Sequence, residues 1–118
     1  MTGPIDETAF AETVAMVGGD VGFVRDLVAE YRADGTTRVA DMRAALVAGE
    51  AEDLRRAAHT LKGSSASLGA LDLADACRAI EIAAHEGQLA GLETAVASVA
   101  SQFDAVVAAL EERTGGAE

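Results

Sequence analysis

Apolar residues in the last third of the chain recur at alternating intervals of three and four, and this regularity constrains the fold more than any other feature. Such a seam is typical of a helix that packs lengthwise against other helices, in a bundle or a coiled coil. It predicts one helix over residues 89–112 and a frayed tail over residues 113–118. The residues of the seam are Leu89, Leu92, Val96, Val99, Phe103, Val106 and Leu110.

Aspartate and glycine residues divide the rest of the chain into four further helices. Asp6 and Asp20 stand where N-cap residues belong, and a glycine follows each predicted C-terminus. Gly35 interrupts the second of these helices and allows a kink or a frayed turn there. The only proline is Pro4, so no proline breaks a predicted helix. The four predicted helices span residues 5–17, 20–48, 51–68 and 71–86.

Four long helices joined by turns of two to four residues predict an all-α fold. Because such turns are too short for crossover connections, the expected architecture is an up-down-up-down antiparallel four-helix bundle. The length of 118 residues fits one domain over residues 1–118. Cys77 is the only cysteine, which excludes a disulfide framework. The sequence offers no cluster of three metal ligands.

The chain is strongly acidic, with a formal net charge of −11. This charge argues against general nucleic-acid binding and against docking on an anionic membrane. The alternative interpretation is that the acidity only keeps the protein soluble. Since there is no signal-peptide pattern and no apolar run of membrane-spanning length, we expect a soluble cytoplasmic protein.

One histidine dominates the third predicted helix. At about 100° per residue, five residues fall on one side of this helix and form its core face. His59 points away from that face, toward solvent or a partner. The core face consists of Leu54, Ala58, Leu61, Ser65 and Leu68.

The residues three and four positions from His59 are its neighbours on the helix surface. Three of them are cationic, namely Arg55, Arg56 and Lys62, and Lys62 is the only lysine of the chain. The fourth is Gly63, and a glycine inside a helix costs about 1 kcal/mol relative to alanine. Its presence therefore indicates that a side chain at this position would obstruct the imidazole.

This arrangement suits a histidine that takes up and releases a phosphoryl group. A neutral imidazole is a competent nucleophile near pH 7. Phosphoryl transfer depends on positioning and on charge neutralisation, to which the neighbouring cations can contribute. Ala66 is small enough to keep access open, and Ser64 is a candidate for the docking surface. The alternative is an ordinary surface histidine without a chemical role.

A carboxylate on the fourth predicted helix is a candidate partner for His59. Glu81 shares a helix face with Cys77 and Ala84, and a carboxylate on a packed face needs a partner. The third and fourth helices are antiparallel neighbours, so Glu81 and His59 lie at similar heights. We expect Glu81 to accept a hydrogen bond from one ring nitrogen, which leaves the other, Nε2, as the nucleophile. The alternative is that Glu81 extends into solvent.

Two other polar residues of the fourth helix lie near Glu81. Arg78 is one turn before Glu81 and is predicted to flank the site. His85 is one turn after it and is interpreted as an ordinary histidine at a helix C-terminus, where the helix dipole favours it.

The segment around His59 resembles the signature of histidine-containing phosphotransfer (HPt) domains of two-component phosphorelays. The resemblance extends to a Gly-Gly-Asp sequence before a long helix and to the leucine-rich helix after the motif. It implies that His59 is phosphorylated, that Lys62 assists, that Gly63 clears space and that the short first helix caps one end of the bundle. HPt domains often carry Glu or Gln at the position of Glu81. The motif reads His59-Thr60-Leu61-Lys62-Gly63-Ser64-Ser65, followed by Leu68-Gly69-Ala70.

The resemblance further implies a role and partners. The chain would accept a phosphoryl group on His59 from a receiver-domain aspartyl-phosphate, or directly from a histidine kinase, and pass it to a response-regulator receiver. It would bind no cofactor itself, because the Mg²⁺ needed for transfer belongs to the receiver. We expect a monomer, and the sequence leaves open whether the seam of the last helix is wholly internal or partly a dimer surface.

The sequence contains no nucleotide-binding glycine loop, so we expect no autokinase activity. Two alternatives come from other functional classes. One is a non-catalytic helical adaptor that binds a receiver or another signalling partner without using His59 chemically. The other is an acid–base enzyme that uses His59 and Glu81, which would require His59 to lie at the floor of a deep pocket.

Overall fold

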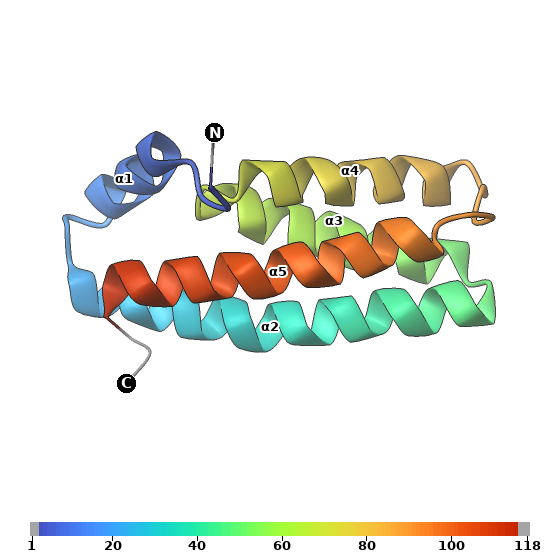
Figure 1. Ribbon diagram of the computed structural model, residues 1–118, viewed down its shortest axis with the longest axis horizontal. Coiled ribbons are helices and arrows are strands. Elements are labelled where there is room, and N and C mark those ends of the chain that lie inside the picture. The colour runs from blue at the N-terminus through green and yellow to red at the C-terminus, as the bar shows by residue number, and fades with distance from the viewer. Residues whose placement is uncertain (1–2, 116–118) are drawn as a thin grey trace.

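The computed structural model describes residues 3–115, which contain five helices and no strand. The four long helices form an up-down-up-down antiparallel bundle, and the short first helix lies across one end (Figure 1). Both the predicted all-α architecture and the predicted capping helix are therefore confirmed. The helices are α1 (Glu7–Met16), α2 (Val21–Ala48), α3 (Ala51–Ser67), α4 (Leu71–His85) and α5 (Glu93–Thr114).

The long helices form a closed ring, in which α3 packs against α2 and α4, and α5 also packs against α2 and α4. Local sequence signals set the ends of these helices. The Asp20 carboxylate accepts a hydrogen bond from the Phe23 N–H (3.0 Å) and begins α2. Gly49 ends α2 with φ +73°, a left-handed conformation that glycine adopts without strain. The chain thus reverses within two residues and α3 runs antiparallel to α2.

The core lies on the helix faces that the sequence predicted. All five residues of the predicted core face of α3 are at most 5% exposed. The seam of α5 is also buried from Val96 onward, so it faces the other helices of the bundle and not a second molecule. None of the helices within residues 3–115 is long and apolar enough to cross a membrane.

The start of the last helix differs from the prediction. Helix α5 begins at Glu93 and not at residue 89, and the preceding connection over residues 86–92 is longer than the predicted two to four residues. Leu89 and Leu92 continue the apolar spacing from within this connection and pack against the core. Gly91 has φ +82°, which interrupts the helical path. The side-chain spacing therefore extends further than the backbone helix does.

The end of the chain also differs from the prediction of a frayed tail over residues 113–118. Thr114 is the last residue of α5 and is buried, and its carbonyl accepts hydrogen bonds from the Arg25 guanidinium (2.9 and 3.3 Å). Arg113 forms an ion pair with Glu7 of α1. The prediction is therefore wrong for these two residues, and residues 116–118 lie outside the described part of the chain.

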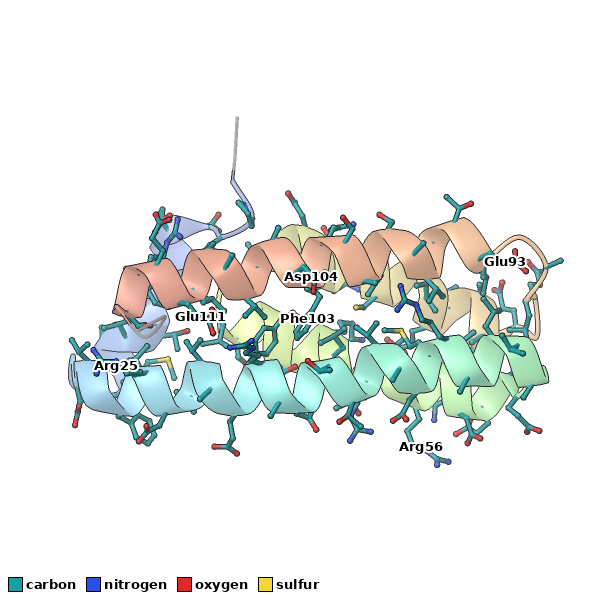
Figure 2. The ribbon with its side chains drawn as sticks, turned by 60° about the horizontal axis from the view of Figure 1, so that its bottom comes forward. Arg25, Arg56, Glu93, Phe103, Asp104 and Glu111 are labelled. Carbon is teal, nitrogen blue, oxygen red and sulfur yellow. The ribbon has the colours of Figure 1, made fainter. Side chains whose placement is uncertain are left out.

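Gly35 does not interrupt α2, which runs unbroken through it, so the predicted frayed turn is absent. A Cβ atom at this position would lie 2.2 Å from Cε1 of Phe103. Figure 2 shows the Phe103 side chain directed from α5 toward α2, where its ring centroid lies 5.3 Å from that of Tyr31. The glycine is thus explained by close approach of an aromatic ring.

Helix α1 is held beside the C-terminal end of α3. The Asp6 N–H donates to the Gly69 carbonyl (2.8 Å), and the Thr13 hydroxyl donates to the Ser67 carbonyl (2.5 Å). Ile5, just before the helix, is buried in the core. The capping helix is therefore attached directly to the helix that carries His59.

Candidate functional site

His59 lies near the middle of α3 on the side opposite to the core. Its side chain is 60% exposed, whereas Ala58 and Leu61, its neighbours on the core face, are fully buried. The predicted orientation is confirmed. An imidazole this exposed does not lie at the floor of a deep pocket, which removes the observation that the acid–base enzyme alternative required.

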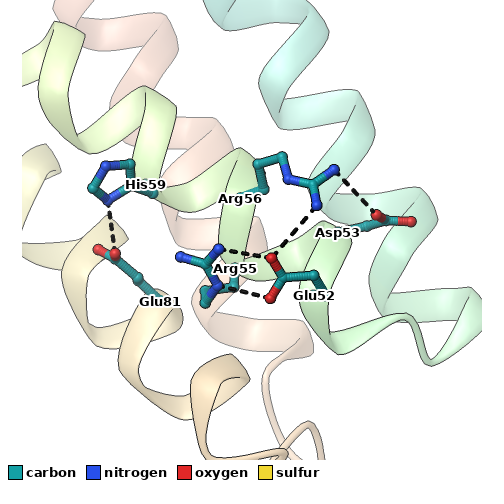
Figure 3. Close-up of polar contacts among 6 residues, drawn as sticks. All are labelled: Glu52, Asp53, Arg55, Arg56, His59 and Glu81. Carbon is teal, nitrogen blue, oxygen red and sulfur yellow. Dashed lines mark hydrogen bonds and ion pairs between the residues drawn. The ribbon is translucent and has the colours of Figure 1, made fainter.

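Glu81 of α4 contacts the imidazole as the sequence predicted. Nδ1 of His59 and Oε2 of Glu81 are 2.7 Å apart (Figure 3). The pKa of the Glu81 carboxyl is lowered, chiefly by Lys62 and further by His59, although burial opposes the shift. An ionised carboxylate only accepts hydrogen bonds, so Nδ1 carries the proton. In a neutral ring Nε2 is then unprotonated and free to act as a nucleophile.

Lys62 makes its contact with Glu81. Its Nζ lies 2.7 Å from Oε1 of Glu81, while Oε2 faces His59. Each carboxylate oxygen therefore has one cationic or hydrogen-bonding partner. The Glu81 side chain is only 16% exposed, so the ion pair with Lys62 offsets part of the cost of a carboxylate that is largely removed from solvent.

The two arginines near His59 are paired with acidic residues of their own helix. Arg55 donates to both oxygens of Glu52 (2.8 and 2.7 Å). Arg56 lies 3.5 Å from Glu52 and 3.9 Å from Asp53. In Figure 3 the ring nitrogen that Glu81 leaves free points away from both guanidinium groups. The two arginines that the sequence places beside His59 are therefore not directed at Nε2.

Glu52 and Asp53 are the residues that the sequence reasoning missed. The signal was present, because acidic and basic residues three or four positions apart on a helix form ion pairs. The Arg55 guanidinium lowers the pKa of the Glu52 carboxyl to about 2. Glu52 therefore stays ionised at neutral pH and competes with other anions for Arg55.

Small residues line the flank of His59 toward the C-terminal end of α3. Apart from its chain neighbours and the backbone of its own helix, a Cβ atom added at Gly63 would meet no atom within 4 Å. The Ser64 hydroxyl is directed back to the carbonyls of Thr60 and Leu61 (both 3.3 Å), and Ala66 is exposed. The access that the glycine predicted is thus present, and nothing within the protein requires the space.

The remaining predicted residues of α4 have other surroundings. Arg78 lies 3.6 Å from Asp75 of its own helix, so its part in the site stays a prediction. His85 is the last residue of α4, as expected. Cys77 is fully buried, and this burial raises the pKa of its thiol to about 12, which leaves it unreactive at neutral pH.

A buried hydrogen bond fixes α3 against α2 below the site. The hydroxyl groups of Tyr31 and Ser65 are 2.8 Å apart, and both residues are buried. Ser65 was predicted on the core face, where a hydroxyl needs a partner. Within residues 3–115, no group of three or more His, Cys, Asp and Glu side chains is placed to hold a metal ion.

Comparison with known proteins gives consistent results. A family model described as Hpt domain matches residues 26–113. The crystal structure of histidine-containing phosphotransfer protein B (HptB) from Pseudomonas aeruginosa PAO1 is similar, with 25% identity and a TM-score of 0.87 over 98% of this chain and 97% of that one. A rice protein assigned as a histidine-containing phosphotransfer protein has 25% identity and a TM-score of 0.73 over 94% and 85%. A search of curated proteins finds no match.

Proposed function

Because the chain belongs to the Hpt domain family, and is thus a histidine phosphotransfer protein of phosphorelays, we propose that His59 is the residue that carries the phosphoryl group. The observation that supports this most directly is the pairing of Nδ1 with Glu81 on an exposed ring. This pairing leaves Nε2 unprotonated beside the open flank at Gly63.

In the proposed step, the lone pair of Nε2 attacks the phosphorus of an aspartyl-phosphate on a receiver domain. The bond between phosphorus and the aspartyl oxygen breaks, and the aspartate leaves as a carboxylate. The phosphoryl group then passes from Nε2 to the aspartate of a second receiver by the same exchange. The proton on Nδ1 stays in place throughout, hydrogen-bonded to Glu81.

Glu81 and Lys62 support this chemistry in the proposal. A bond from Nε2 to phosphorus makes the ring more positive, and the Glu81 carboxylate stabilises that charge. Lys62 holds the second oxygen of Glu81 at 2.7 Å. Because Lys62 is also one turn from His59, its ammonium group would offset part of the phosphoryl charge.

The proposed docking surface is the exposed face of α3 around His59, with Gly63, Ser64 and Ala66 as its smooth part. Three arginines, Arg55, Arg56 and Arg78, stand at its border. The partners are receiver domains and the kinase or hybrid kinase upstream. The Mg²⁺ for transfer would be held by the receiver, and this chain would work as a cytoplasmic monomer.

The test is phosphotransfer from a phosphorylated receiver domain with Mg²⁺, comparing the wild type with His59→Gln. We expect an acid-labile, base-stable phosphate on the wild type only. Labelling of both proteins would contradict the assignment of His59. Tight binding of a receiver by both proteins, without labelling of either, would support the non-catalytic adaptor.

A further inference from the structure

The guanidinium group of Arg55 has two carboxylates within its electrostatic reach. It donates through Nε and Nη2 to the two oxygens of Glu52, in a paired geometry typical of strong arginine–carboxylate contacts. Figure 3 shows this group between Glu52 and Glu81. The pKa of Arg55 is raised mainly by Glu52 and also by the charge of Glu81, which places Glu81 close enough to attract it.

Glu81 is an alternative partner for Arg55. Pairing of Arg55 with Glu81 instead of Glu52 would disturb the hydrogen bond between Glu81 and His59. Its oxygens are already used by Lys62 and by Nδ1 of His59, one each. A guanidinium group that turned to Glu81 would compete with Nδ1 for Oε2, because arginine favours paired contacts with a carboxylate. The imidazole would then lose the acceptor that keeps its proton on Nδ1.

We infer that Glu52 is a positioning residue that holds Arg55 away from Glu81 and so preserves the hydrogen bond between Glu81 and His59. Glu52 does not touch the imidazole and acts only through Arg55. The inference rests on the proposed function insofar as a bare Nε2 is what accepts the phosphoryl group. On this inference the ion pair between Glu52 and Arg55 protects the contact between Glu81 and His59, a role that an ordinary surface ion pair does not have.

Arg56 provides an internal comparison. It also contacts Glu52, but at 3.5 Å, and its second contact is Asp53 at 3.9 Å. Arg56 is directed away from Glu81 in Figure 3. Removing Glu52 leaves Arg56 its contact with Asp53 but takes from Arg55 its ion-pair partner, and Figure 3 shows Arg55, not Arg56, on the side of Glu81.

The experiment follows the tautomer of His59 in Glu52→Gln by ¹H–¹⁵N NMR of the imidazole nitrogens at alkaline pH, where the ring is neutral. The His59→Gln spectrum separates the signals of His59 from those of His85. In the wild type we expect a protonated Nδ1 and an unprotonated Nε2. In Glu52→Gln we expect this single-tautomer pattern to be lost. Far-UV circular dichroism verifies that the variant is folded.

Double variants test whether Arg55 causes the loss of the single tautomer in Glu52→Gln. Glu52→Gln combined with Arg55→Gln should restore the wild-type pattern, whereas Glu52→Gln combined with Arg56→Gln should not. Asp53→Asn is the matched control and should leave the tautomer unchanged. An unchanged tautomer in Glu52→Gln, or no rescue by Arg55→Gln, would overturn the inference.

A second readout separates this inference from the proposed function. Phosphoramidate is a small phosphoryl donor that needs no protein partner: Nε2 attacks its phosphorus, the P–N bond breaks and ammonia leaves. We expect slower labelling of Glu52→Gln and recovery in the variant that also carries Arg55→Gln. If the wild type is labelled by neither phosphoramidate nor receivers, the proposed function fails. The tautomer data still decide the role of Glu52.

Discussion

Two positions inside helices, 35 and 63, are occupied by glycine for different physical reasons. Gly35 is required by packing, because a Cβ atom there would collide with the ring of Phe103 at 2.2 Å. Gly63 is surrounded by open space within the chain, since a Cβ atom at this position would have no neighbour within 4 Å. The stability of the isolated protein therefore gives no reason for Gly63, and we propose that the reason lies with a molecule that approaches His59.

We expect Gly63→Ala to stabilise the isolated protein while slowing phosphotransfer with receivers. Alanine is favoured over glycine in a helix by about 0.5–1 kcal/mol, and no contact opposes this gain. The added methyl group would stand on the flank that we propose a receiver approaches. Chemical denaturation gives the stability, and phosphotransfer kinetics give the activity. Labelling by phosphoramidate serves as the control and should change little. A destabilised variant would contradict this account of Gly63.

Glu81 is expected to make the free energy of unfolding depend on pH in the acidic range. Its pKa is lowered in the folded state from the ordinary value of 4.5. Its contribution to stability is therefore present above pH 4.5 and is lost as the pH falls through the lower folded value. We expect Glu81→Gln to lose less stability than the wild type between neutral pH and pH ~3, as measured by denaturant unfolding at both pH values. Equal losses would rule out this contribution.

The orientation of His59 could be predicted from the sequence, but the choice that each arginine makes among its candidate acidic partners could not. Helical periodicity places His59 opposite Leu61, and the antiparallel adjacency of the third and fourth helices places Glu81 at a similar height. Arg55 has two carboxylates near its guanidinium group, Glu52 of its own helix and Glu81 of α4, and the sequence does not rank them. The spacing of three residues makes Glu52 a candidate partner for Arg55, but only the structure shows that Arg55 pairs with Glu52 and not with Glu81.

At the scale of elements, the packing of α2 against α5 includes a close approach between Gly35 and the ring of Phe103. We expect Gly35→Ala to destabilise the protein by about 1–3 kcal/mol, as overpacking of a core does. Denaturant unfolding measures this change. In a Phe103→Leu background the ring that causes the collision is gone, so the same substitution should cost less. An equal cost in both backgrounds would show that Phe103 is not the cause.

The helices themselves were largely predictable, because caps and apolar spacing are local properties of the sequence. The start of α5 was not. Leu89 and Leu92 keep the spacing of the seam although they belong to a connection, and they do so because a turn can also place a leucine against the core. Apolar spacing reports which residues face the core, and only the glycine at position 91 indicates where the helix cannot extend.

For the whole molecule, the closed ring of four helices leaves the seam of α5 inside the bundle. A buried seam is unavailable to a second copy, and a net charge of −11 makes copies repel one another. We expect a monomer of 12.0 kDa in analytical ultracentrifugation over a range of concentrations. A concentration-dependent dimer would contradict this expectation.

The open space at Gly63 also bears on how this protein would respond to artificial selection. If a library of random variants were sorted only for resistance to heat, alanine would accumulate at position 63, while glycine would be retained at position 35. The survivors would be sturdier proteins that exchange phosphoryl groups poorly with their partners. A designer who optimised the chain for stability alone would remove the residue that no contact within the fold protects.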